Sequence, residues 1–373
     1  MNRDVIVERL AKEFETKKEY VANVMDMLDN GDTVPFISRY RKELHGDMDV
    51  RGLSERYEYM KNLEARKETA LAAIEEQGKL TPGLKSRFEN ALTLGEVEDL
   101  YLPYRPKKKT RASVAKARGL EPLADLLLSN GKAPAEKLAE NFLGDEVPDA
   151  AAALNGACDI IAERVAENAD IRSMARSYVF ERGTLSAARA TDEDTVYDNY
   201  YDFHAAPKRI QGHQCLAINR AEKEGALKVK IESDSDRMIA QIERRIIPRG
   251  SNYADILDAA VTDSYDRLLE PAIIRDIRSS LTEQAEDGAI RNFKVNLKAL
   301  LMQAIVPDKV IMGLDPGYSH GCKVGIIDSQ GAVLTTDVVY LHQKNRAADR
   351  LSQLCKKYGV GCIAIGNGTA SRE

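Results

Sequence analysis

The stretch Gly313-Leu314-Asp315-Pro316-Gly317, with Gly366-Asn367-Gly368-Thr369 farther along, decides the fold of the C-terminal part of this chain. The apolar run 310–314 predicts a short strand that carries Asp315 at its C-terminal tip. The Pro-Gly pair that follows favours a tight turn. An aspartate at such a position is either a functional carboxylate or simply part of the turn.

The segments after this turn predict two more strands, a helix and a final strand. Residues 323–328 alternate in polarity, a hairpin loop containing glycine follows, and 332–340 is rich in β-branched residues. Residues 346–358 have helical spacing, and 361–365 form a short apolar run. Three antiparallel strands, a helix and a fourth strand are typical of a ribonuclease-H-like α/β fold. We expect 308–373 to be an incomplete domain of this kind, because the sequence ends just beyond the fourth strand.

The rest of the chain is predicted to be helical, so the fold class is mainly α with a C-terminal α/β unit. Long helices are expected at 53–77 and 273–305, and only 226–231 alternates strictly enough to predict a strand before residue 308. Four-residue spacing marks one face of the later helix: Ile273, Ile277, Leu281 and Ala285. The expected domains are an N-terminal helical domain at 1–200, a central region with long helices and a short β element at 201–307, and the α/β unit at 308–373.

Composition and charge exclude several classes of protein. A hydrophobic content of 43% with 30% charged residues is typical of a folded chain rather than a disordered one. The five cysteines are scattered, which argues against a disulfide framework and against a zinc site. No signal peptide and no apolar run of membrane-spanning length is present, so we expect a cytoplasmic protein without membrane contacts. Because the net charge is −5, nucleic-acid binding would require a local basic patch.

One basic segment stands out in this acidic chain. Residues 103–118 contain seven basic and no acidic side chains, and the two prolines at its start favour an extended conformation. Tyr101 and Tyr104 offer surfaces for stacking. Contact with nucleic-acid phosphates explains the segment about as well as a solvated loop, or as arginines paired with acidic helices. The candidate binding residues are Arg105, Lys107, Lys108, Lys109, Arg111, Lys116 and Arg118.

Three roles fit Asp315. It is a turn residue, which is the commonest case, or a carboxylate that binds a divalent metal for phosphodiester cleavage, or part of a phosphate-binding hairpin as in actin-like ATPases. In the second case Glu373 is the other candidate catalytic residue, and at least one further carboxylate is needed. We expect no cofactor otherwise. The glycines at 366–369 lack the third glycine of a dinucleotide fingerprint.

Five segments of this sequence resemble the Tex family of bacterial transcription accessory proteins, and they run in family order from end to end. The segments are Phe36-Ile37-Ser38-Arg39-Tyr40-Arg41-Lys42-Glu43, Glu76-Gln77-Gly78-Lys79-Leu80-Thr81, Glu98-Asp99-Leu100-Tyr101-Leu102-Pro103-Tyr104-Arg105-Pro106-Lys107, residues 313–323 and residues 363–373.

The resemblance implies an N-terminal region with helix-turn-helix character and a YqgF-type, ribonuclease-H-like domain. It also implies binding of RNA or DNA without sequence preference, with RNA polymerase or ribosome-associated factors as candidate partners. The family's nuclease-like domain is regarded as lacking demonstrated catalysis, so we expect a non-enzymatic scaffold. Two alternatives stay open: a metal-dependent, structure-specific nuclease resembling Holliday-junction resolvases, acting through Asp315 and Glu373, and a protein-binding scaffold of the transcription or translation machinery.

Overall fold

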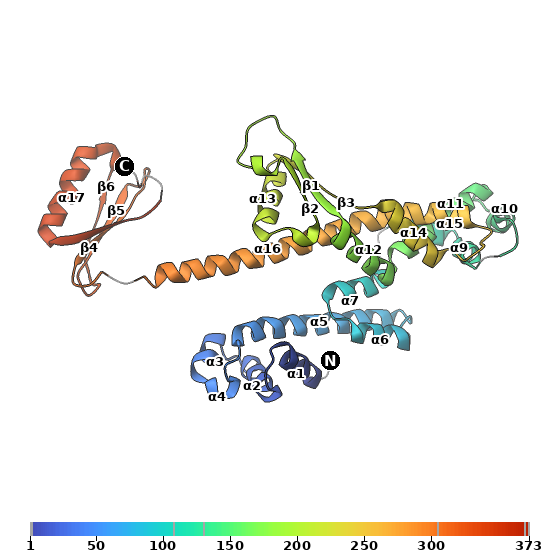
Figure 1. Cartoon of the computed structure of the whole chain (residues 1–373), viewed down its shortest axis with the longest axis horizontal. Coiled ribbons are helices and arrows are strands. Elements are labelled where there is room, and N and C mark those ends of the chain that lie inside the picture. Colours follow the sequence, from blue (N-terminus) through green and yellow to red (C-terminus); the bar gives the residue numbers. More distant parts are fainter. Residues whose placement is uncertain (1–2, 107–108, 130, 304–305, 369–370, 372–373) are drawn as a thin grey trace. The chain divides into compact units, whose positions relative to one another are not determined.

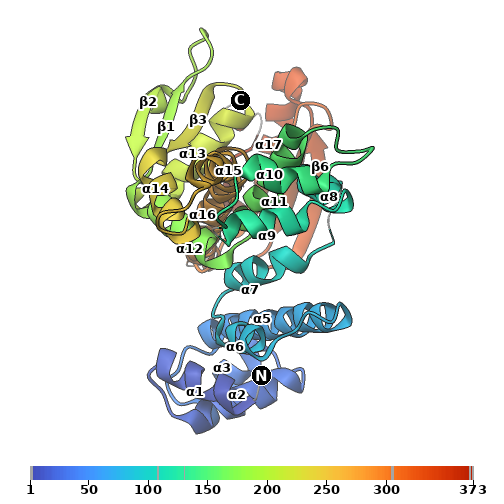
Figure 2. The same ribbon diagram turned by 90° about the vertical axis from the view of Figure 1, so that its right-hand side faces the viewer.

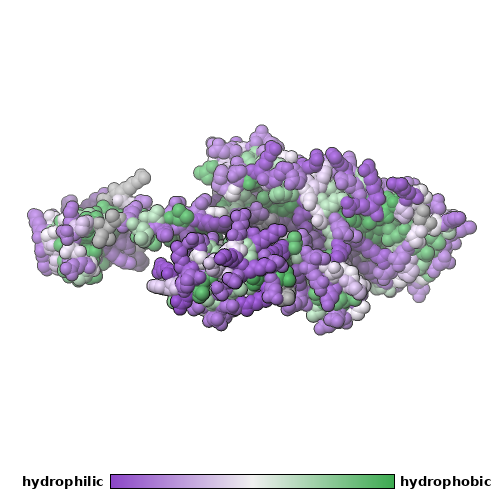
Figure 3. All heavy atoms as spheres, turned by 60° about the horizontal axis from the view of Figure 1, so that its bottom comes forward, coloured by the Kyte–Doolittle hydropathy of each residue, from purple (hydrophilic) through white to green (hydrophobic). Residues whose placement is uncertain are grey.

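The computed structural model describes residues 3–106, 109–129, 131–303, 306–368 and 371 (Figure 1). Contacts along the chain divide it into two compact units, Met1–Ala289 and Ile290–Glu373, and each is described by itself. Most of the face drawn in Figure 3 is hydrophilic, with apolar atoms in small separate patches. The predicted fold class is confirmed: the chain is mainly helical and ends in a small α/β unit.

The first helices of unit 1 enclose a small core of their own. Leu10 of α1 and Met25 of α2 are fully buried, and both belong to a cluster that includes Leu53 near the start of α5. The carboxylate of Asp49 caps α5 by accepting from the backbone N–H of Arg51. The helices are α1 (Arg3–Glu13), α2 (Lys18–Asp29), α3 (Val34–Tyr40), α4 (Lys42–His45) and α5 (Val50–Glu76).

A second cluster forms where α6 (Pro82–Asn90) and α7 (Leu94–Tyr101) fold back on the C-terminal half of α5. Ile74 and Phe88 are fully buried there. Helix α7 runs directly into a 3₁₀ turn, η1 (Leu102–Tyr104), and then into the basic segment. The end of α7 therefore sets where that segment begins.

The largest core of unit 1 surrounds α11, which packs on α8, α9 and α15 (Figure 2). At Gly156 of α11 an added Cβ would lie 2.4 Å from Cδ1 of the buried Leu120, so any larger residue would have to displace that side chain. The helices are α8 (Arg111–Ala117), α9 (Glu121–Leu128), α10 (Ala135–Ala139), α11 (Ala150–Ala166), α12 (Ala169–Arg182), α13 (Gly212–Lys223), α14 (Ser235–Ile246), α15 (Ala254–Asp263) and α16 (Glu270–Leu301).

A three-stranded antiparallel sheet packs against this core, in the order β2-β1-β3. The strands are β1 (Thr184–Arg189), β2 (Asp202–Ala205) and β3 (Leu227–Glu232). Only β3 was predicted, so the expectation of a single strand before residue 308 is wrong. Strand β1 is rich in small residues and β2 is only four residues long, and neither gives a clear β-strand pattern.

A π-helical turn, η5 (Ser264–Leu269), joins α15 to α16. The hydroxyl of Ser264 is fully buried and donates to the carbonyl of Ala162 in α11 at 2.7 Å, which ties the turn to the core. The predicted apolar face of α16 is confirmed, because its buried residues are Ile273, Ile277, Leu281 and Ala285.

Unit 2 contains one four-stranded sheet in the order β6-β5-β4-β7. Strand β4 pairs antiparallel with β5 and parallel with β7, and β6 pairs antiparallel with β5. Helix α17 covers one face, where Leu354 meets Met312 and Ile326 in a buried cluster. The elements are β4 (Val310–Asp315), β5 (Cys322–Ile327), β6 (Val333–Val339), α17 (Lys344–Tyr358) and β7 (Val360–Ile365). The predicted single layer of strands is confirmed.

Two carboxyl groups face each other where α14 packs on α15. A hydrogen bond with Asp258, partial burial and the negative charge of Asp258 raise the pKa of Glu243 from 4.5 to about 7. The folded state therefore holds a proton between about pH 4.5 and 7 that the unfolded chain has released. The protonated Glu243 therefore adds its whole contribution to the free energy of unfolding below pH 4.5, and this contribution is lost as the pH rises through 7.

We predict that Glu243→Gln flattens this pH dependence, since the amide stays neutral and still donates to Asp258. The pair is largely solvent-accessible, so screening limits the effect to about 1 kcal/mol or less between pH 5 and 8. Urea unfolding at several pH values in this range measures it. Glu136→Gln, on the exposed side of α10, is the matched control and should leave the slope unchanged. An unaltered slope in Glu243→Gln contradicts the prediction.

Candidate nucleic-acid interface

The basic segment is anchored at both ends. At its start, the side-chain amide of Gln77 donates to the carbonyl of Tyr104 at 2.9 Å. At its end, Thr110 and Ser113 form a capping box that starts α8, and the Thr110 hydroxyl also donates to Glu163 of α11 at 3.0 Å. Lys107 and Lys108 lie outside the described residues. The anchors fix the approach and exit of the segment.

The two anchored ends of the segment border one cleft of about 730 Å³ in unit 1. Arg105 and Arg111 line it from the segment, and Arg267 of η5 and Arg275 of α16 line it from elements more than 150 residues farther along the chain. Arg172 of α12 is a fifth arginine in its wall. The remaining lining residues are Leu102, Thr110, Ala112, Asp159, Glu163, Ala166, Glu167, Leu268, Ala272 and Asp276.

The candidate cations of the basic segment divide into paired and unpaired ones. Lys116 pairs with Glu163 at 3.3 Å, and Arg118 pairs with Glu146 at 3.7 Å. Arg105, Lys109 and Arg111 are exposed, and within the described ranges their side chains make no hydrogen bond or ion pair. The structure therefore supports the paired alternative for the end of the segment and leaves the other three cations open to a ligand.

Some charged side chains in the walls of the cleft form ion pairs with each other, and others do not. The guanidinium of Arg267 donates to Asp263 at 2.8 Å and lies 3.5 Å from Asp159, and hydrogen bonding by Arg267 lowers the pKa of Asp263 despite its partial burial. Burial raises the pKa of Asp159. Arg275 is exposed and, like Arg105, has no partner among the described residues. Arg111 makes no hydrogen bond or ion pair there, but its positive charge acts to lower the pKa of both Asp159 and Asp263. Among the described residues, three guanidinium groups that make no hydrogen bond or ion pair thus border one cleft.

A buried ion-pair network holds the two sides of the cleft in place. The carboxylate of Asp99, at the C-terminal half of α7, accepts from Arg172 at 2.6 Å and from Arg176 at 2.7 Å. Both arginines, on successive turns of α12, also donate to Asp276 of α16 at 3.1 Å. The side chains of Asp99 and Arg172 are only 6% and 9% exposed. The network therefore joins α7, which leads into Arg105, to the turn of α16 that carries Arg275.

Asp315 lies in unit 2 at the C-terminal tip of β4. Met312 and Leu314 point toward α17, so alternation places Asp315 on the open face of the sheet, across from Lys323 of β5. The tip of β7 lies beside it, because the backbone N–H of Gly366 donates to the carbonyl of Leu314 at 2.8 Å. A hollow of about 980 Å³ covers this part of the open face.

Glu373 lies outside the described residues, so its position relative to Asp315 stays a prediction. Over the described part of the chain, no group of three or more His, Cys, Asp or Glu side chains is arranged to hold a metal ion. The same part contains no helix that is both long and apolar enough to span a membrane.

Sequence reasoning found one side of the cleft and missed the other. The cations at 105–118 are clustered in sequence, whereas Arg267 and Arg275 are separated by two helical turns within long charged helices. Their eight-residue spacing places both on one side of a helix, but the same spacing is common on solvated faces. Asp99 carried no sequence signal, since only the fold brings it to Arg172 and Arg176.

Models of three Tex domains match this chain. The Tex-like protein N-terminal domain matches residues 4–75, the Tex central region-like model matches 130–293, and the Tex protein YqgF-like domain matches 309–373. The chain belongs to the Tex family. The basic segment of this Tex-family chain lies between the first two matched ranges.

Curated relatives are similar over nearly the whole chain. An uncharacterised protein of Bacillus subtilis, YdcI, is 41% identical over 99% of this chain and 53% of its own length. The transcriptional accessory protein Tex of Neisseria gonorrhoeae is 38% identical over 98% of this chain and 50% of its own length. The human S1 RNA-binding domain-containing protein 1 is 32% identical over the full chain and 40% of its own length. The chain thus spans about half the length of most curated relatives it matches.

We predict that Asp99→Ala destabilises unit 1 by about 3 kcal/mol, because it leaves buried Arg172 and its neighbour Arg176 with only the exposed Asp276 as their shared partner. Urea unfolding followed by circular dichroism measures the loss. Glu8→Ala is the matched control, since Glu8 pairs with Lys18 between side chains that are 68% and 63% exposed, and it should lower stability far less than Asp99→Ala does. Equal losses in both variants would show that the network adds nothing beyond a surface pair.

Proposed function

We propose that this Tex-family chain is a non-catalytic nucleic-acid-binding scaffold of the transcription machinery in the cytoplasm. In this proposal the cleft bordered by Arg105, Arg111 and Arg275 holds the phosphate backbone of RNA or DNA. RNA polymerase or ribosome-associated factors are the candidate protein partners. The observation that carries the proposal is the meeting, at one cleft, of three exposed guanidinium groups from two distant parts of the chain, none of which makes a hydrogen bond or ion pair with the described residues.

The chemistry of the cleft favours phosphate over a base edge. A guanidinium group presents a planar fork of N–H donors that matches two phosphate oxygens, and backbone contacts of this kind carry no sequence information. Two acidic residues in the wall of the cleft, Asp159 and Asp276, already pair with arginines: Asp159 with Arg267, and Asp276 with Arg172 and Arg176. A phosphate entering the cleft therefore meets free cations beside neutralised carboxylates.

The relatives support a nucleic-acid ligand. One is named a transcriptional accessory protein, and another is named for an S1 RNA-binding domain. The net charge of −5 excludes general attraction to polyanions, so binding has to be local and sensitive to salt. We infer that this chain binds single strands or duplexes weakly and with little sequence preference.

Charge reversal of the cleft tests the proposal. We predict that the combined variant Arg105→Glu/Arg111→Glu/Arg275→Glu loses affinity for a labelled single-stranded oligonucleotide about tenfold or more at low salt. Each phosphate contact that is removed should also lower the slope of log K against log salt by about 0.7 to 0.9. Fluorescence anisotropy over a salt series, with RNA and DNA of unrelated sequences, gives both quantities.

A matched variant separates this cleft from overall charge. Lys85→Glu/Lys137→Glu/Arg245→Glu changes the net charge by the same amount at exposed positions outside the cleft. It should change the affinity less than about threefold and leave the salt slope nearly as it was. Equal losses in both variants, or a loss that depends on oligonucleotide sequence, would contradict binding of the backbone in the cleft.

A second candidate function rests on the position of Asp315. The tips of β4 and β7 lie side by side, which is where two carboxylates would have to meet for metal-dependent cleavage. If the chain is such a nuclease, branched DNA with magnesium or manganese is cut and Asp315→Asn abolishes the cut. We predict no cleavage by either protein; cleavage that depends on Asp315 would replace the scaffold proposal with the nuclease.

A further inference from the structure

Strand β6 forms one edge of the sheet in unit 2. It pairs with β5 and has no other strand beside it among the described residues. Several of its side chains are apolar and exposed, including Val333 at 68% and Val338 at 43%. An exposed edge strand of this composition is a site to which another extended chain can pair.

At every second residue of β6, the backbone N–H and C=O point away from β5. The N–H of Val338 donates to the carboxylate of Asp337 at 2.8 Å rather than to β5. Because the N–H and C=O of one strand residue point to the same side, Val338 and the residue two before it, Thr336, face away from β5. The open edge therefore offers two pairs of backbone donors and acceptors.

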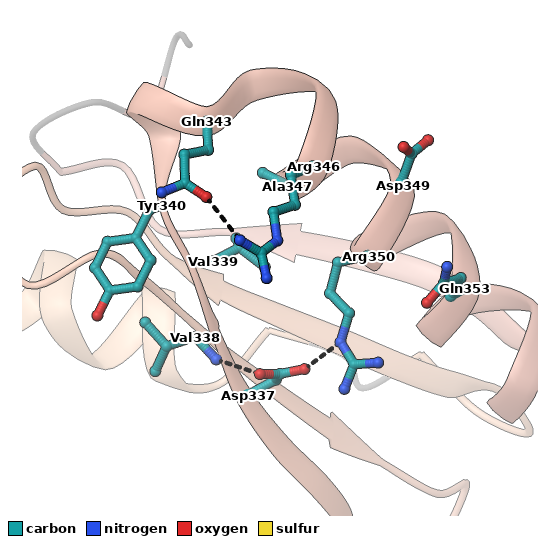
Figure 4. Close-up of a pocket in the computed structure, with 10 residues that line it drawn as sticks. All are labelled: Asp337, Val338, Val339, Tyr340, Gln343, Arg346, Ala347, Asp349, Arg350 and Gln353. Carbon is teal, nitrogen blue, oxygen red and sulfur yellow. Dashed lines mark hydrogen bonds and ion pairs between the residues drawn. The ribbon is translucent and has the colours of Figure 1, made fainter.

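A groove of about 590 Å³ runs between this edge and α17 (Figure 4). From β6 and its continuation it is lined by residues 337–340, and from α17 by Arg346, Ala347, Asp349, Arg350 and Gln353. Helix α17 carries five basic side chains and one acidic side chain. Only Arg346, Asp349 and Arg350 of these charged residues line the groove, so it combines an unpaired strand edge with a wall that carries two arginines and one aspartate.

The carboxylate of Asp337 occupies the place that a ligand would take. It accepts hydrogen bonds from the Val338 N–H and from Nε of Arg350 at 2.7 Å. Both bonds lower the pKa of Asp337, and the bond from Arg350 has the larger effect. Arg346, in contrast, meets only the side-chain oxygen of Gln343 at 3.5 Å. One carboxylate is already bound here by a backbone N–H and an arginine together, and a second arginine lies one turn away on α17.

We propose that this groove binds an extended acidic segment of a partner protein, which pairs with the outer edge of β6 and places its carboxylates against Arg346 and Arg350. Residues 337–340 span about 13 Å along the strand, enough for about four residues of the segment. Because alternate side chains of a strand point to the same face, acidic residues at every second position would face α17. Asp337 competes with the segment for Val338 and Arg350.

A nucleic acid fits this groove less well than a peptide. Phosphate oxygens are acceptors only, so they satisfy the N–H groups of the edge but face its carbonyl oxygens without a donor. A peptide strand supplies donors and acceptors alternately and matches both. The unpaired carbonyls therefore favour a polypeptide, and competition by an oligonucleotide is one outcome of the test.

The test uses residues 1–373 and a short fluorescein-labelled peptide in which Glu and Val alternate. We expect it to bind at least tenfold more tightly than the same peptide with Lys in place of Glu. N-methylation of the backbone at alternate residues, on the register that faces β6, should abolish binding because it removes the donors of the ladder. Hydrogen exchange should slow at 333–340 when the peptide binds.

Variants of the groove decide between this proposal and its rivals. Arg346→Glu/Arg350→Glu should weaken binding about tenfold, whereas the matched control Lys356→Glu/Lys357→Glu, at the far end of α17 and outside the groove, should change it less than about threefold. Asp337→Ala should strengthen binding about threefold or more, since it frees the Val338 N–H and Arg350.

Three results would overturn the proposal: equal binding of the Lys peptide, no effect of N-methylation, or complete competition by a single-stranded oligonucleotide. Hydrogen exchange of the free variants over unit 2 establishes that they are folded. If Arg346→Glu/Arg350→Glu is unfolded, Asp337→Ala still tests the proposal, because this variant is expected to bind the peptide more tightly. Unchanged or weaker binding of the peptide by Asp337→Ala would contradict competition by Asp337.

Discussion

The shared carboxylate of Asp99 is the constraint on which the cleft of unit 1 depends. It lies at the junction of three helices and accepts from Arg172 and Arg176, which in turn donate to Asp276. Removing the charges of Arg172 and Asp99 from water is unfavourable unless both are paired, so α7, α12 and α16 are held in one arrangement. The basic segment, residues 103–118, begins two residues after α7 ends, and it is therefore delivered to the side of α16 that carries Arg275.

The other wall of the cleft depends on the π-helical turn between α15 and α16. That turn is tied to α11 through the buried hydroxyl of Ser264, and it carries Arg267 into the cleft, where Asp263 and Asp159 neutralise it. π-helical turns inside long helices often accompany functional sites because they redirect side chains without breaking the helix. The wall of the cleft thus contains two kinds of cation: those that form ion pairs within the protein and those that are available to a ligand.

The sequence predicted those parts of the structure in which local pattern and tertiary packing agree. The four-residue spacing of Ile273, Ile277, Leu281 and Ala285 identified the buried face of α16. Two short apolar runs, one alternating run and one run rich in β-branched residues identified the four strands of unit 2. Strands β1 and β2 were missed because small residues and a short length give no periodic signal; packing and pairing with β3 make them strands. Arg275 was missed for a related reason, since a single arginine on a charged helix gains its role only from what lies across the cleft.

The central claim is that a nucleic-acid backbone lies between the basic segment and α16. A crystal structure of residues 1–373 with a short single-stranded oligonucleotide tests it most directly. The account predicts a backbone phosphate within hydrogen-bonding distance of Arg275 and of at least one of Arg105 and Arg111, with the Asp99 network intact. An oligonucleotide bound elsewhere, with these three arginines facing solvent, would contradict it.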